Sequence, residues 1–222
     1  MPSKTLIVDD LTLLLMDDAS GAIPTAGTLY YTQGGAVLVE LGLAGHVRVD
    51  EGDQGLTGIR VHAVVGRPPQ DPLLRDAYKK VAEKVRGVQT LLIEIGTGLR
   101  EPVFDRLVER GTLRRETKKT LGLFRTTSTT IADTAYKTAL LEKVRAVLID
   151  GEEPDVRTAA LIGLLSASGS LPNLHRTIPW SGQLHQRAKE LERTSWGAEA
   201  VNSAVLRTVA AVAAGPAAAV SG

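Results

Sequence analysis

Basic side chains gather in the sequence between Leu99 and Thr126. This stretch holds eight basic and four acidic side chains, a net charge of +4, whereas the whole chain of 222 residues carries only +1. Guanidinium and ammonium groups bind phosphate oxygens through charge-assisted hydrogen bonds. The stretch therefore predicts the binding of an anion, carried by a nucleic acid or by a lipid headgroup. The residues expected to bind it are Arg100, Arg114, Arg115, Lys118 and Lys119.

Three apolar residues, Leu121, Leu123 and Phe124, lie at the tip or flank of the turn that follows these basic residues. Basic residues around an exposed apolar tip suit an anionic membrane surface. Each lysine or arginine near such a surface contributes about 1 kcal/mol, and the apolar side chains add burial. The same tip also suits packing on a second subunit, which would make the protein a homo-oligomer. A third interpretation is a hairpin that is only solvated.

A basic hairpin after a helix is also typical of winged-helix proteins, whose wing rests on nucleic-acid phosphates. Here the polar face of the preceding helix carries Glu101, Asp105 and Glu109. These acidic side chains would repel a duplex. DNA binding is therefore a weaker hypothesis than lipid binding, and a nucleic acid is not an expected partner.

No residue pattern in the chain predicts catalysis. The absence of cysteine excludes disulfides, thiolate metal sites and a cysteine nucleophile. The four histidines do not stand at metal-ligand spacings, and GTGLRE from Gly96 lacks the remainder of a phosphate-binding loop. We therefore expect no enzyme activity, no catalytic residue, no metal and no cofactor.

The basic stretch must be positioned by a largely helical chain. Apolar residues follow one another with few gaps over 27–45, which predicts a helix buried on most sides with Val37, Leu38 and Leu41 inside. HVRV and GIRVHAVVG alternate like the two strands of a hairpin, and TLRRETKKTLGLFRTT predicts two short strands around the basic turn. Helical spacing predicts the remaining helices over 71–85, 99–110, 131–150, 154–168, 181–195 and 198–213.

These elements predict a mainly α fold, a single compact helical domain over residues 1–222 with protruding β-hairpins and a frayed tail from about residue 214.

The first residues lack the apolar segment of a secretory signal. Spanning a bilayer takes about 20 apolar residues, and Arg207 and Pro216 interrupt the alanine-rich C-terminal segment. We therefore expect a cytoplasmic protein whose contact with a membrane is peripheral, on the inner face.

Three motifs, in their order and spacing, resemble the Golgi phosphoprotein 3 family in its bacterial branch. They are DDLTLLLMDDASG from Asp9, GGAVLVELGLAGHVRVD from Gly34 and LREPVFDRLVERGTLRRE from Leu99. The resemblance covers the chain from about Leu6 to Ala213 and implies a mostly helical domain with a protruding hairpin. It also implies a peripheral membrane protein, since eukaryotic members bind phosphatidylinositol 4-phosphate and act as adaptors that retain glycosyltransferases.

In that family a tryptophan and a basic residue near the start of the first buried helix hold the lipid headgroup, together with two arginines three residues apart. The resemblance puts Arg100 at the second of these arginines. Thr97 stands at the first arginine, and Gly34 stands at the basic position. The tryptophan position falls near Thr25, where the neighbouring Tyr30 or Tyr31 offers an aromatic ring instead. One arginine forms at most a bidentate pair with a phosphate.

We therefore predict a peripheral protein that binds anionic phospholipid headgroups through the five basic residues of the Leu99–Thr126 stretch. A membrane-protein client is a further expected partner. The alternative is an oligomeric protein-interaction or regulatory module, similar to a winged helix, whose hairpin joins the subunits.

Overall fold

A computed structural model of the protein describes residues 4–24, 29–49, 60–120, 124–174 and 177–193. Most of these residues are helical, which confirms the predicted mainly α fold. The helices are α1 (Ile7–Leu15), α2 (Leu29–Leu43), α3 (Pro72–Glu83), α4 (Val88–Gly96), α5 (Arg100–Glu109), α6 (Thr134–Arg145), α7 (Val156–Ala167) and α8 (Gly182–Arg193). The strands are β1 (Val47–Val49), β2 (Arg60–Ala63) and β3 (Arg86–Gly87) in one antiparallel sheet, and β4 (Leu113–Thr120) and β5 (Phe124–Ile131) in another.

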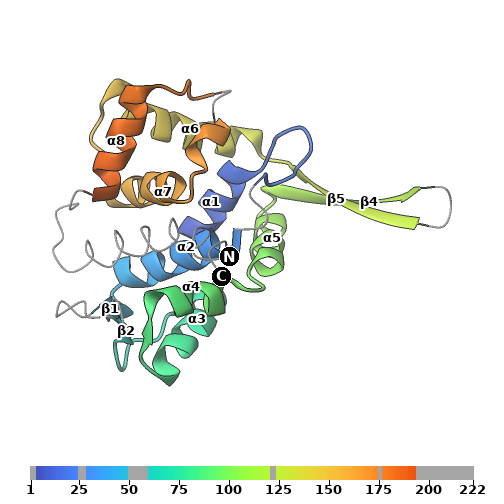
Figure 1. Ribbon diagram of the computed structural model, residues 1–222. Helices are drawn as coiled ribbons and strands as arrows, with labels where there is room; N and C mark the ends of the chain where they lie inside the picture. The colour runs from blue at the N-terminus through green and yellow to red at the C-terminus, as the bar shows by residue number, and fades with distance from the viewer. Residues whose placement is uncertain (1–3, 25–28, 50–59, 121–123, 175–176, 194–222) are drawn as a thin grey trace, which may run out of the picture.

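Helix α1 runs through the middle of the molecule. All its residues from Ile7 to Leu15 are buried, because most of them are aliphatic and other helices pack around them. In Figure 1, α6, α7 and α8 lie on one side of α1, and α3 and α4 lie on the other side beyond α2. The prediction for α2 is confirmed, since Val37 and Leu41 are fully buried and Leu38 is 4% exposed.

Helices α2 and α4 approach each other closely because glycines lie at their contact. A Cβ atom on Gly96 would lie 1.8 Å from the backbone oxygen of Tyr30. One on Gly34 would lie 2.4 Å from the backbone oxygen of Leu92. Glycine lacks a Cβ atom, so it alone permits these backbone contacts.

The β4–β5 hairpin projects away from the helical body (Figure 1). The two strands pair in antiparallel register from Leu113 opposite Ile131 to Thr120 opposite Phe124. Leu113 is buried and joins the base of the hairpin to the core. Above this base, the β5 residues are mainly serine and threonine, so the shaft is polar and is held by its backbone ladder.

The observed elements differ from the sequence predictions in several places. The sequence pattern predicts a helix from residue 131, but β5 continues to Ile131 and α6 begins only after Asp133. The Asp133 side chain caps α6 by accepting a hydrogen bond from the Tyr136 backbone N–H at 2.9 Å. The last part of the predicted 131–150 helix is π-helical. Helices α1 and α4 and strand β3 are not predicted from the sequence. The predicted helix 198–213 and the tail after it lie outside the described residues.

Candidate anion-binding surface

Arg100 is the first residue of α5, and its side chain is exposed. Its guanidinium carbon lies 5.3 Å from the centroid of the Phe104 ring, a cation–π distance. The sequence pattern predicts Arg100 opposite Val103 and Leu107 or at the edge of that face. In the observed helix, residues four and seven apart share one face, so Arg100 lies on the same face as Phe104 and Leu107. Its side chain is nevertheless exposed, because Arg100 is the first residue of α5. Among the described residues, Arg100 has no carboxylate partner.

Arg115 links the hairpin to α5. Its Nη1 lies 2.7 Å from Asp105 Oδ1, and its Nη2 lies 3.2 Å from Glu101 Oε2. Because both carboxylates are well exposed, the two ion pairs contribute roughly 1 kcal/mol or less each to stability. Their larger effect is on local charge, since the single Arg115 guanidinium partly offsets Glu101 and Asp105, two of the three acids of α5 that disfavour an anionic partner.

Arg114 lies on the opposite face of β4 from Arg115, because successive residues of a strand point to opposite faces. Its side chain is exposed and makes no hydrogen bond or ion pair with any residue in the described part of the chain. By the same alternation, the strand position of Lys118 falls on the Arg114 face and that of Lys119 on the Arg115 face. Of the predicted headgroup residues, Arg114 and Arg115 therefore point to opposite faces of β4 and do not face one pocket.

The predicted apolar tip lies only partly within the described structure. Phe124 begins β5, where its backbone pairs with Thr120. Leu121 and Leu123 lie outside the described residues. The prediction that this tip contacts a membrane or a second subunit stays a prediction.

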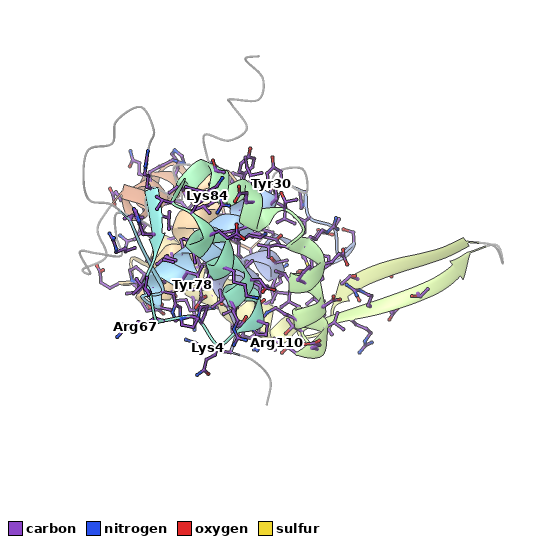
Figure 2. All side chains as sticks on the ribbon, turned by 90° about the horizontal axis from the view of Figure 1, so that it is seen from below. Lys4, Tyr30, Arg67, Tyr78, Lys84 and Arg110 are labelled. Carbon is purple, nitrogen blue, oxygen red and sulfur yellow. The ribbon has the colours of Figure 1, made fainter. Side chains whose placement is uncertain are left out.

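Two further arginines of the basic stretch turn toward the body of the protein. Arg106 pairs with Asp71 at 2.9 Å and with Asp9 at 3.3 Å. Arg110 donates a hydrogen bond to the Thr5 hydroxyl. Figure 2 shows Arg110 and the labelled Lys4 at one edge of the molecule and Tyr30 at the opposite edge. The positive charge that the stretch presents at the surface is therefore smaller than its sequence suggests.

Only part of the headgroup pocket implied by the family resemblance exists around Arg100. Gly34, at the position of the basic residue, is buried against the backbone of α4 and leaves no room for a side chain. Thr97, at the position of the first arginine, is an exposed residue at the end of α4. Tyr30 is half-buried, and its ring stacks on that of Tyr31 with a centroid distance of 4.2 Å. The junction of α4 and α5 thus offers one guanidinium, from Arg100, and one hydroxyl, from Thr97, while the backbone of Tyr30 lies against Gly96 at the end of α4.

The acidic pair of the first motif belongs to the interior. Asp9 is fully buried and Asp10 is 4% exposed. Arg157, from α7, places Nη2 at 3.0 Å from Asp10 Oδ2 and Nη1 at 3.1 Å from Glu40 Oε2. The Tyr136 hydroxyl donates to Asp10 at 2.6 Å. These contacts join four helices, α1, α2, α6 and α7, through one set of charges.

Burial shifts the protonation of two members of this network, Asp10 and Tyr136. It raises the pKa of Asp10, against the lowering effects of the Tyr136 hydroxyl and the Arg157 guanidinium. Burial and the Asp10 carboxylate together raise the pKa of Tyr136 to about 12. Tyr136 is therefore a neutral hydrogen-bond donor at every physiological pH.

The same carboxylates complete the start of α1. Asp9 accepts a hydrogen bond from the Leu6 backbone N–H at 2.9 Å, and Glu40 accepts one from the Ile7 backbone N–H at 2.6 Å. The first N–H groups of a helix have no partner inside the helix, so buried acceptors here stabilise α1. The acidic pair therefore has a structural role.

A family model described as Golgi phosphoprotein 3 (GPP34) matches residues 7–208, nearly the whole chain. The chain belongs to this family. The match includes α1, which carries the acidic pair, and the β4–β5 hairpin, so the network and the basic surface both lie within the GPP34 domain. A search of curated proteins finds no match to the chain. Among the described helices of this GPP34 domain, none is long and apolar enough to cross a membrane.

The sequence reasoning missed the partners of the acidic pair in this GPP34 domain. One signal was available: Glu40 stands in the middle of an otherwise apolar buried segment. A buried carboxylate requires a cation or several hydrogen-bond donors. That requirement predicts a basic partner for Glu40, but it does not identify Arg157, which lies 117 residues away in the chain.

Proposed function

We propose that this GPP34 protein attaches peripherally to anionic membranes, by charge rather than by recognition of one headgroup. The observation that carries the proposal is the pairing of Arg115 with Glu101 and Asp105. This pairing partly offsets two of the three acids on α5, and Arg100 and Arg114 are exposed cations without carboxylate partners among the described residues. An anionic leaflet attracts each such cation by about 1 kcal/mol.

The distribution of these cations favours attraction by charge. Specific binding of a phosphomonoester uses several donors fixed around one phosphate. Here Arg100 lies on α5, Arg114 lies on the exposed face of the hairpin, and Gly34 and Thr97 provide no charge. The family resemblance supports a membrane as the partner, while these residues favour anionic phospholipids in general over phosphatidylinositol 4-phosphate in particular.

Charge attraction predicts that Arg100→Lys keeps most of the affinity for anionic vesicles and that Arg100→Glu does not. Lysine retains the charge, although it cannot form the bidentate fork of arginine. Glutamate changes the local charge by two units, which at about 1 kcal/mol each corresponds to a loss of roughly thirtyfold. The measurement is the affinity of each variant for phosphatidylglycerol vesicles at one fixed salt concentration.

Arg67→Glu is the matched control for these variants. Arg67 is exposed, and Figure 2 labels it on a part of the molecule away from Tyr30 and the α4–α5 junction. The substitution changes the net charge equally, yet we expect binding close to that of the wild type. If Arg100→Lys loses binding as fully as Arg100→Glu, a specific headgroup site exists and the proposal of charge attraction is wrong.

A second candidate function is oligomerisation through the hairpin, which would also provide a surface for a membrane-protein client. The observation that favours it is the projection of β4–β5 from the helical body (Figure 1), with Leu121 and Leu123 in the sequence that joins the strands. We expect light scattering to show a species larger than a monomer, and Leu121→Asp with Leu123→Asp to convert it to a folded monomer. A wild-type protein that is monomeric at high concentration would exclude this candidate.

A further inference from the structure

A cleft of about 420 Å³ lies between α3 and α5, on a face of α5 that Arg100 does not use. Helix α5 lines it with Pro102, Arg106 and Glu109, which recur at helical spacing and share one face. Arg100 lies two residues before Pro102, and residues two apart on a helix do not face the same way. The cleft therefore shares Thr97 with the α4–α5 junction but opens on a different face of α5 from the one that carries Arg100. Its volume falls in the range of roughly 300–1,000 Å³ that is usual for small-molecule sites.

The inner surface of the cleft is mainly apolar. Figure 2, seen from below, looks onto the side of the molecule where α3 and α5 lie next to each other. Ala77, Ile95 and Leu99 are all buried at its floor. Thr97 adds a hydroxyl that makes no hydrogen bond to any residue the structure describes. The apolar lining residues are Pro72, Leu73, Ala77, Ile95, Leu99 and Pro102.

Both positive charges of the cleft already have partners. Arg106 bridges from α5 to Asp71, the residue that caps α3, at 2.9 Å. Lys80, further along α3, donates from Nζ to the Glu94 backbone oxygen at 2.5 Å. An anionic ligand would therefore have to compete with existing contacts for either cation.

The charges around the cleft are mixed in sign and favour neither an anion nor a cation. Asp76 pairs with Lys79 at 3.0 Å, and Glu109 is an exposed carboxylate without a partner among the described residues. These acids repel an anion and attract a cation, and Lys80 and Arg106 do the opposite, so an ion gains little from them while it loses hydration in a mainly apolar cleft. We propose that the cleft binds a small, mainly apolar molecule with one uncharged polar group, such as a hydroxyl, that hydrogen-bonds to Thr97.

The test compares three probes of equal chain length, 1-octanol, octanoate and octylammonium, titrated into the full chain by calorimetry. We expect 1-octanol to bind and both ions to bind roughly tenfold more weakly, the ratio that about 1.4 kcal/mol of uncompensated ion desolvation produces. The absence of 1-octanol binding would overturn the proposal. Equal or tighter binding of either ion would overturn the assignment of an uncharged ligand.

Variants then locate the binding site. Ala77→Phe fills the cleft from its floor, and we expect it to lower the 1-octanol affinity at least tenfold. Ala82→Phe is the control, because Ala82 is an exposed residue of the same helix that does not line the cleft. If circular dichroism shows that Ala77→Phe does not fold, Leu73→Trp fills the cleft from its partly exposed wall instead. If a folded variant whose cleft is filled keeps its affinity for 1-octanol, the cleft is not the binding site. The same conclusion follows if Ala82→Phe loses as much affinity for 1-octanol as the filled variant does.

Discussion

Replacing Arg157 by methionine is expected to lower the free energy of unfolding by about 3 kcal/mol, the lower end of the cost of removing one partner from a buried ion pair, because the Arg157 side chain is 33% exposed. The substitution leaves Asp10 and Glu40 buried at 4% and 8% exposure without their guanidinium. Methionine retains most of the aliphatic volume, so the loss reports on charge more than on packing. Urea denaturation at pH 7 measures it.

Arg145→Met is the matched control, because Arg145 pairs with Asp150 at 2.8 Å where both side chains are about 40% exposed. An exposed pair of this kind contributes about 1 kcal/mol or less. Equal losses in the two variants would contradict a structural role for the buried network.

The difference in free energy of unfolding between the wild type and Arg157→Met should also become smaller at acidic pH. The pKa of Asp10 is raised in the folded protein, so the folded state holds this proton more tightly than the unfolded state does. As the pH falls through the folded pKa, Asp10 becomes neutral and the cost of its unpaired buried charge disappears. Arg157 in the wild type opposes this protonation. A deficit that grows on acidification would contradict this account.

Gly96→Ala is expected to destabilise the protein by about 1–3 kcal/mol or more, the range for overpacking a close contact. The new Cβ atom would lie 1.8 Å from the Tyr30 backbone oxygen, and a backbone atom cannot rotate away as the end of a side chain can. Helices α2 and α4 must separate to accept it. Because Tyr30 and Thr97 flank this contact, the junction beside Arg100 shifts as well. Thermal and urea denaturation measure the effect.

Gly42→Ala tests whether the close contact itself causes the loss. Gly42 lies in α2, and a Cβ atom there meets no atom within 4 Å. Alanine in a helix is favoured over glycine by about 1 kcal/mol, so this variant should be as stable as the wild type or more stable. Destabilisation of both variants alike would mean that the α2–α4 contact is not as close as described.

The sequence predicts the elements that have a strong local pattern. The dense apolar residues of α2 predict its burial, and Val37, Leu38 and Leu41 are inside as expected. The two hairpins follow from alternating residues around turns. Helix α4 is missed because its nine residues, VQTLLIEIG, are short and apolar, and such a run does not distinguish a helix from a strand.

The candidate surface is predicted in composition but not in arrangement. Counting charges over the basic stretch cannot show that Arg106 turns inward to Asp9 and Asp71, because these partners are distant in sequence. Counting charges also cannot predict the ion pairs of Arg115, because they depend on the angle between β4 and α5. The separation of Arg114 from Arg115 onto two faces follows from strand alternation once β4 is known to be a full strand. Long-range contacts thus decide which charges remain available.

The most direct test of the central claim is cosedimentation of the wild-type protein with vesicles over a range of salt. We predict binding to phosphatidylglycerol vesicles that weakens steeply from low to physiological salt, because the Debye length falls from about 30 Å to about 8 Å. Vesicles of phosphatidylcholine alone should pellet little protein at any salt concentration. Equal pelleting with both kinds of vesicle, unchanged by salt, would contradict attachment by charge.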